Sequence, residues 1–353
     1  MDNNNFREEF ELLTVCVDMH GCPNRCKHCW LGHSKNGSLK AEDLVFAAES
    51  FRPFADKLEV YDWYREPDFA DNYQEMTALR ERLSDIKPEH FELFSFWRAA
   101  RDGEYVSWLR STGVKRVQIT LFGSEDITDH YVGRKGAFRE IMTAVDMLIE
   151  NGIAPRLQIF INKSNLSELP FLSELAEKLE KRCERAGLTF SAFVHQGSCD
   201  GANADLYDIR VTYEDLSAIP ESLAKATLRH FGAKTLDEVF GQPESELLKA
   251  LSEDNGTARL SDNPPVFFVD GSFDVYPNFS APAPYWRLGN LKEDGAAAIT
   301  KNYRENRSEA QRARLCVPIS EMAKKCGDPD SGRLFTRDDY IDYLLNSYCE
   351  RKD

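Results

Sequence analysis

Short apolar runs alternate with amphipathic stretches from residue 12 to about residue 194. The apolar runs are rich in β-branched and aromatic residues and show no polar face, which is typical of strands buried on both sides. They cover residues 12–17, 57–63, 91–96, 115–122, 156–162 and 188–194. The stretches between them carry apolar residues at helical spacing, and they cover residues 39–51, 72–84, 104–111, 137–152 and 164–187. The pattern predicts six βα units.

Strands buried on both faces and joined by crossover helices form a parallel sheet. Six such units favour a partial (βα)6 barrel over a closed barrel of eight units. We therefore expect an α/β fold with two domains, a partial barrel over residues 1–194 and a C-terminal α+β extension over residues 195–353. The extension carries a hairpin pattern around the turn at residues 270–272. Chemistry on such barrels gathers at the carboxyl ends of the strands.

Composition and charge narrow the class of protein. The chain has 353 residues, of which 42% are hydrophobic, which is enough to bury a core and excludes a disordered protein. Its 44 Lys and Arg residues against 59 Asp and Glu residues give a net charge of −15, which disfavours nucleic acid and anionic membranes as partners. No apolar stretch reaches the ~18 residues of a membrane span, and the polar, acidic start lacks a signal-peptide pattern. We expect a cytoplasmic protein.

The nine cysteines are unevenly spaced, and three of them form a compact pattern. Cys22, Cys26 and Cys29 follow the first predicted strand as C-x3-C-x2-C. Soft thiolates in a reducing compartment favour zinc or an iron–sulfur cluster. A structural zinc site needs a fourth ligand, for which Cys16, His20 or His33 is available, and would indicate a zinc-stabilised binding protein. Three thiolates on a [4Fe–4S] cluster instead leave one iron open.

The C-x3-C-x-aromatic-C pattern resembles the hallmark of the radical S-adenosylmethionine (SAM) superfamily. The resemblance implies that Cys22, Cys26 and Cys29 ligate a [4Fe–4S] cluster and that His28 takes the aromatic position near the adenine of SAM. It also implies that the open iron chelates SAM, that an electron donor such as flavodoxin or ferredoxin reduces the cluster, and that cleavage of SAM yields a 5′-deoxyadenosyl radical. The cofactor supplies the difficult chemistry, and the protein supplies positioning.

Further positions match the family in part. Tyr64-Arg65-Glu66-Pro67 stands where the family has Gly-Gly-Glu-Pro, and the resemblance assigns Glu66 to the amino group of SAM. The resemblance also implies that Thr120 and Arg134 meet the ribose or carboxylate of SAM. The alternatives are that Thr120 is an ordinary strand residue and that Arg134 is a surface charge. Aromatic and basic side chains at 63–65 and 96–98 are expected near the site, as substrate contacts or as packing.

The C-terminal region resembles a degenerate SPASM-type domain, which in the family holds auxiliary iron–sulfur clusters. Asn278 stands where that pattern has a cysteine, and the tail keeps only Cys316, Cys326 and Cys349. Two auxiliary clusters are excluded by this count, and we expect none, with a lid in their place. One cluster held by these three residues together with Cys199 stays open as an alternative. Cys199 is also the candidate thiol hydrogen donor, with Tyr207, Tyr276 and Tyr285 as alternatives.

The sequence therefore predicts a radical SAM enzyme acting on a biosynthetic small molecule, namely a sugar, nucleoside or amino-acid derivative of natural product biosynthesis. Without an auxiliary cluster to accept an electron, a redox-neutral outcome is expected. Only 21 residues precede Cys22, which is shorter than the N-terminal peptide-recognition domain of many peptide-modifying members. A maturase acting on a ribosomally made peptide is the alternative.

Overall fold

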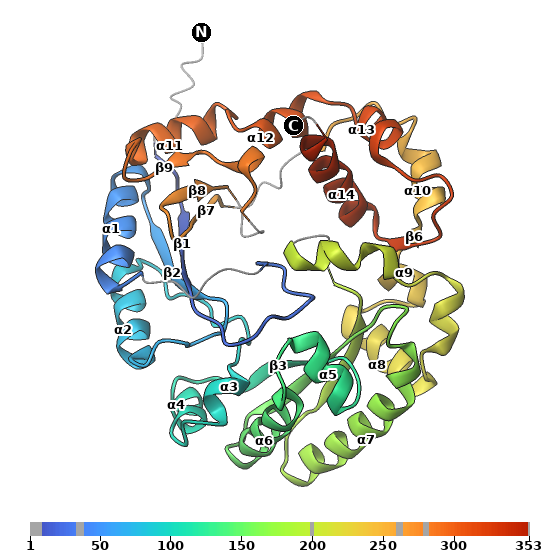
Figure 1. Ribbon diagram of the computed structural model, residues 1–353. Helices are drawn as coiled ribbons and strands as arrows, with labels where there is room; N and C mark the ends of the chain where they lie inside the picture. Colours follow the sequence, from blue (N-terminus) through green and yellow to red (C-terminus); the bar gives the residue numbers. More distant parts are fainter. Residues whose placement is uncertain (1–8, 33–38, 198–200, 259–263, 278–281, 352–353) are drawn as a thin grey trace.

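The computed structural model describes residues 9–32, 39–197, 201–258, 264–277 and 282–351. Two sheets line the interior, one mixed and one parallel throughout, and helices lie outside them (Figure 1). One sheet has the order β2-β1-β7-β8-β9 and the other the order β3-β4-β5. The strands of the N-terminal half are β1 (Leu13–His20), β2 (Leu58–Tyr64), β3 (Arg116–Leu121), β4 (Ala154–Phe160) and β5 (Ser191–His195). The α/β class and its barrel-like parallel arrangement are confirmed.

The helices between these strands bury the faces that the spacing of apolar residues predicts. In α6 (Ala137–Glu150), Ile141, Ala144, Val145 and Leu148 are buried, which is the three- and four-residue spacing of one helix face. The others in this half are α1 (Ala41–Phe51), α2 (Tyr73–Leu83), α3 (Phe96–Ala99), α4 (Tyr105–Ser111), α5 (Glu125–Val132) and α7 (Leu169–Arg185). Their apolar faces close the core around the strands, so the carboxyl ends of the strands are held on a rigid frame.

The predicted strand over residues 91–96 is wrong. Phe91 and Glu92 have φ angles of 55° and 56°, and Phe96 already begins α3. A left-handed residue costs about 1–2 kcal/mol and breaks the extended backbone, so no ladder forms there. The segment still lies beside β3, because the carbonyl oxygen of Glu92 accepts a hydrogen bond from the backbone N–H of Gln118 at 2.9 Å.

The C-terminal half is joined to the first sheet. The predicted hairpin is confirmed as β7 (Val266–Val269) and β8 (Asp274–Tyr276), and β7 pairs in parallel with β1. The helices of this half are α8 (Glu221–Phe231), α9 (Leu236–Phe240), α10 (Glu244–Leu251), α11 (Gly295–Arg304), α12 (Glu309–Cys316), α13 (Ile319–Cys326) and α14 (Arg337–Glu350). Short strands β6 (Gln242–Pro243), β9 (Gly289–Asn290) and β10 (Leu334–Phe335) connect them. Among the described helices, none has the length and apolar character that a membrane crossing requires.

Candidate active site

The loop that carries the three cysteines leaves β1 through two left-handed residues. His20 and Gly21 have φ angles of 60° and 72°, and a Cβ atom at Gly21 would lie 2.4 Å from the ring of Phe69. Glycine is therefore required where the chain turns into the barrel. The backbone N–H groups of Arg25 and Lys27 donate to carbonyl oxygens at the end of α5, each at 2.9 Å. These contacts fix the loop against the mouth of the barrel.

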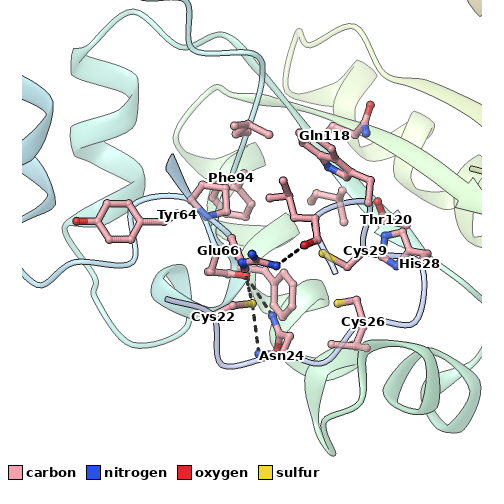
Figure 2. Close-up of a pocket in the computed structure, with 18 of the residues that line it drawn as sticks. Cys22, Asn24, Cys26, His28, Cys29, Tyr64, Glu66, Phe94, Gln118 and Thr120 are labelled. Atoms are coloured by element: carbon pink, nitrogen blue, oxygen red, sulfur yellow. Dashed lines mark hydrogen bonds between the residues drawn. The ribbon is translucent and has the colours of Figure 1, made fainter. Parts of the chain in front are cut away.

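The thiols of Cys22, Cys26 and Cys29 line one cavity, which encloses about 240 Å³ (Figure 2). None of the three forms a disulfide. Burial raises the pKa of Cys22 to about 12 and raises those of Cys26 and Cys29 as well. Thiols in such surroundings become thiolates when a metal supplies the compensating positive charge. The donor set thus suits a soft metal centre.

A zinc ion would need a fourth ligand beside the three thiols. Within the described ranges, no three His, Cys, Asp or Glu side chains are grouped closely enough to hold one metal ion. Cys16, one of the proposed fourth zinc ligands, is fully buried inside β1 and belongs to an apolar cluster. His33, another, lies outside the described residues.

Glu66 connects the turn after β2 to the cysteine loop. Its Oε1 accepts hydrogen bonds from the hydroxyl of Ser95 at 2.6 Å and the backbone N–H of Trp97 at 3.4 Å. Its Oε2 accepts from Nδ2 of Asn24 at 3.1 Å and lies 4.0 Å from the sulfur of Cys22. Burial raises the pKa of Glu66 to about 7. A carboxylate oxygen that accepts one or two bonds keeps room for a ligand ammonium group.

His28 forms another part of the cavity wall. Its ring packs against Phe122 and Phe160, with centroids 4.7 and 5.2 Å apart. Burial lowers the pKa of His28 to about 4, so the imidazole is neutral at pH 7. Its Nδ1 is buried and has no hydrogen-bond partner. An orphaned polar atom in a cavity wall is satisfied when a ligand supplies the partner, so this position fits a cofactor with polar edges.

Comparison with known proteins agrees with these features. Residues 16–164 match the model of the Radical SAM superfamily. These residues form a radical SAM domain. The protein is an enzyme with this domain, and the domain implies a [4Fe–4S] cluster and SAM binding.

Three known proteins to which this radical SAM enzyme is similar share 10–27% sequence identity with it. The Fe-coproporphyrin III synthase of Methanosarcina barkeri is 27% identical over 135 residues, which are 38% of this chain and 33% of the relative. The chain thus spans about a third of that relative's length. The solved structure of anSMEcpe with bound AdoMet and the Cp18Cys peptide is 16% identical, with 97% of each chain covered and a TM-score of 0.48. BtrN in complex with AdoMet and 2-DOIA is 10% identical, with 93% and 95% covered and a TM-score of 0.24.

Thr120 lines the cavity of this radical SAM enzyme, whereas Arg134 is not among the lining residues. Thr120 lies on the β3 wall of the cavity, where its hydroxyl donates to Oε1 of Gln158 at 3.1 Å. Arg134 lies behind the cysteine loop, where its Nε donates to Oδ1 of Asn24 at 2.8 Å and its guanidinium pairs with Glu140. Arg134 therefore reaches Glu66 through Asn24 in this arrangement.

The remaining cysteines lie away from the cavity or outside the described residues. Cys199, the candidate hydrogen donor, lies outside them. Cys326 and Cys349 are buried in an apolar cluster of the C-terminal helices, and Cys316 is exposed at the end of α12.

Reasoning from the sequence missed two polar residues of the site. Asn24 is 3% exposed and bridges Glu66 to Arg134. Asp18 is fully buried near the end of β1 and pairs with Arg65. The signal for Asp18 is a carboxylate inside an otherwise apolar strand, since such a charge is buried only with a partner. Asn24 carries no comparable signal.

Proposed function

We propose that this protein cleaves SAM reductively at a [4Fe–4S] cluster held by Cys22, Cys26 and Cys29 and takes a hydrogen atom from a biosynthetic small molecule. The single observation that supports this is that the thiols of all three cysteines, which form no disulfide, line one cavity together with Glu66 and His28. When bound, the cluster supplies the electron that splits the S–C5′ bond of SAM. The residues around it bind, orient and exclude water.

Three side chains are assigned to SAM itself. Glu66 presents a buried carboxylate that suits the ammonium group of SAM, and Ser95 and Asn24 hold its two oxygens in place. His28 offers its unpartnered Nδ1 and a flat ring to the adenosine part. Thr120 offers a hydroxyl from the β3 wall. Arg134 acts one step away in this proposal, because its bond to Asn24 orients the amide that holds Glu66.

The substrate class is proposed as a sugar, nucleoside or amino-acid derivative, in natural product biosynthesis. We place the substrate beside the thiols, in the cavity that also holds SAM in this proposal. The proposed outcome is redox-neutral, because the cysteines outside the loop are too few for a pair of auxiliary clusters. Residues 1–194 would supply the barrel and residues 195–353 the lid, with flavodoxin or ferredoxin as the electron donor.

Iron analysis and SAM cleavage test the cluster assignment. After anaerobic reconstitution we expect about four irons per chain and 5′-deoxyadenosine when SAM and a strong reductant are added. Cys26→Ala should abolish deoxyadenosine formation, whereas Cys183→Ala, which removes a buried thiol from α7, should retain it. Zinc without iron, or undiminished deoxyadenosine in Cys26→Ala, would refute the assignment.

The substrate class is tested by label transfer. The enzyme is incubated anaerobically with SAM and deuterated candidates, and deuterium in 5′-deoxyadenosine identifies the hydrogen that is abstracted. The panel holds sugars, nucleosides and amino-acid derivatives, a ribosomal peptide, and a coproporphyrin because the curated relative is named for one. Label from the peptide alone would replace the small-molecule proposal by a peptide maturase.

A further inference from the structure

Two of the exposed aromatic rings of the described residues lie in the cavity wall. Trp30 is 37% exposed and Phe91 is 43% exposed, and both line the cavity that holds the three thiols. A ring left open to solvent in a concave site offers a flat apolar face to a ligand. These two side chains therefore form binding surface.

Trp63 joins the two rings into one continuous series. The ring centroids of Trp30 and Trp63 are 5.9 Å apart at an interplanar angle of 71°, and those of Trp63 and Phe91 are 6.3 Å apart at 62°. We call Trp30, Trp63 and Phe91 the aromatic row. It begins one residue after Cys29 and extends along the wall to the turn that replaces the third predicted strand. A molecule resting on the row is thus held next to the cysteine loop.

The turn that presents Phe91 is strained and is held in place by its neighbours. Phe91 and Glu92 are both left-handed, which is an outlier for a bulky aromatic residue. The carboxylate of Glu92 pairs with Arg116 and Arg156, each at 2.7 Å, and its carbonyl accepts from Gln118. Strain that the surroundings maintain in a cavity wall indicates a functional position. Here it places the Phe91 ring in the cavity wall.

Strand β3 contributes polar side chains to the cavity that the aromatic row lines. Gln118 and Thr120 share one face of that strand and line the same cavity (Figure 2). The Gln118 amide gives one bond to Gln158 and accepts one from Arg156, which leaves a donor hydrogen and a lone pair for a ligand. The cavity therefore combines flat apolar rings with an amide and a hydroxyl.

We propose that the aromatic row is the subsite for a flat aromatic or heteroaromatic ring of the substrate. Its rings stack on the substrate ring, while Gln118 and Thr120 serve polar groups at the ring edge. The proposal deepens the proposed function and rests on it, since it narrows the substrate class to nucleosides and aromatic amino-acid derivatives.

Two probes that differ in the flatness of their ring distinguish ring stacking from apolar contact alone. Benzamide and cyclohexanecarboxamide share an amide and a six-membered ring, but only benzamide is flat. Their dissociation constants are measured by NMR on the reconstituted enzyme saturated with S-adenosylhomocysteine, which fills the SAM site. We expect the wild type to prefer benzamide by about 5-fold or more. Phe91→Leu, which keeps apolar bulk without a ring, should reduce that preference, while Trp30 and Trp63 remain in the row. Phe171→Leu should keep it, because Phe171 is similarly exposed but lies on α7.

The outcomes distinguish this proposal from the proposed function. Equal affinity of the two probes, or a preference that is undiminished in Phe91→Leu, would overturn the ring subsite. A preference seen only without S-adenosylhomocysteine would also overturn it, because the row would then serve the cofactor. The proposed function is read separately as 5′-deoxyadenosine from SAM in the wild type, so its failure leaves the probe preference measurable and the ring subsite testable.

Discussion

Nη2 of Arg65 donates a hydrogen bond to Oδ2 of Asp18 at 2.8 Å, and both side chains are buried. Nη1 of the same guanidinium donates to the carbonyl oxygens of Leu31 and Gly32, at the end of the cysteine loop. Arg65 stands in the turn where the family pattern has a glycine. One side chain thus joins the turn after β2, the buried carboxylate on β1 and the end of the loop that follows Cys29.

Arg65→Ala should destabilise the protein and weaken iron binding. Removing the guanidinium leaves the buried Asp18 with only the backbone N–H of His20 at 2.9 Å and the His20 ring at 3.6 Å. Removing one partner of such a buried ion pair costs about 3–5 kcal/mol. It also frees the loop end behind Cys29. We expect the free energy of unfolding in urea to fall by that amount and the iron retained after desalting to fall with it. Arg65→Lys should recover only part of both losses, because an ammonium group cannot reproduce the planar fork.

A double-mutant cycle checks the cause. In an Asp18→Asn background, Arg65→Ala should be less destabilising than in the wild type, because no buried charge is left behind. Strictly additive effects would show that the pair does not act as described.

The five confirmed strands could be predicted because a short run of apolar, β-branched residues forms few structures other than a buried strand. The stretch at 91–96 is just as apolar, but Glu92 is held by Arg116 and Arg156, and that pairing is set by the packed barrel. The same limit applies to the site. The spacing of Cys22, Cys26 and Cys29 is local, so their convergence on one cavity could be predicted. Asn24 and Arg134 are 110 positions apart, and no periodicity reports their contact.

Glu66→Gln should weaken SAM binding without loss of iron. The substitution removes the negative charge assigned to the SAM ammonium group and turns an amide toward the Asn24 donor. A hydrogen bond to a charged group contributes about 1.5–3 kcal/mol, so the dissociation constant for SAM, measured by equilibrium dialysis, should rise roughly 10- to 100-fold.

Ser95→Ala is the matched variant for Glu66, since it removes one hydrogen bond to the carboxylate but keeps its charge. We expect a smaller loss of SAM affinity than in Glu66→Gln. If iron content falls in step with SAM affinity in either variant, Glu66 supports the cysteine loop and does not hold SAM.

Asp62 should make stability fall as the pH rises through the weakly acidic range. Burial raises the pKa of Asp62 from 3.8 to about 6, although Arg80 pairs with it at 3.1 Å and opposes the shift. The folded state therefore holds a proton that the unfolded state releases between pH 4 and pH 6, so stability decreases with pH in that window. Relative to Asp62→Asn, the wild type should lose about 2 kcal/mol between pH 4 and pH 7.

The measurement is urea unfolding of both proteins across this range, with the difference between them plotted against pH. Arg80→Met should enlarge the loss, because the guanidinium that lowers the Asp62 pKa is gone. A difference that does not change with pH would contradict the raised pKa.

Glu244→Gln should loosen the C-terminal helices. Glu244 is fully buried at the start of α10, where its carboxylate accepts from Arg333 at 2.7 Å and from the Tyr340 hydroxyl at 3.1 Å. Its partners come from the segment before β10 and from α14, so one carboxylate ties three elements together. The substitution leaves Arg333 without its buried partner, and we expect the free energy of unfolding in urea to fall by about 3–5 kcal/mol.

Glu221→Gln is the control, because it breaks an exposed pair with Lys225 and exposed pairs contribute little to stability. It should leave the free energy of unfolding unchanged. Equal effects of the two substitutions would mean that the buried carboxylate does not hold these helices together.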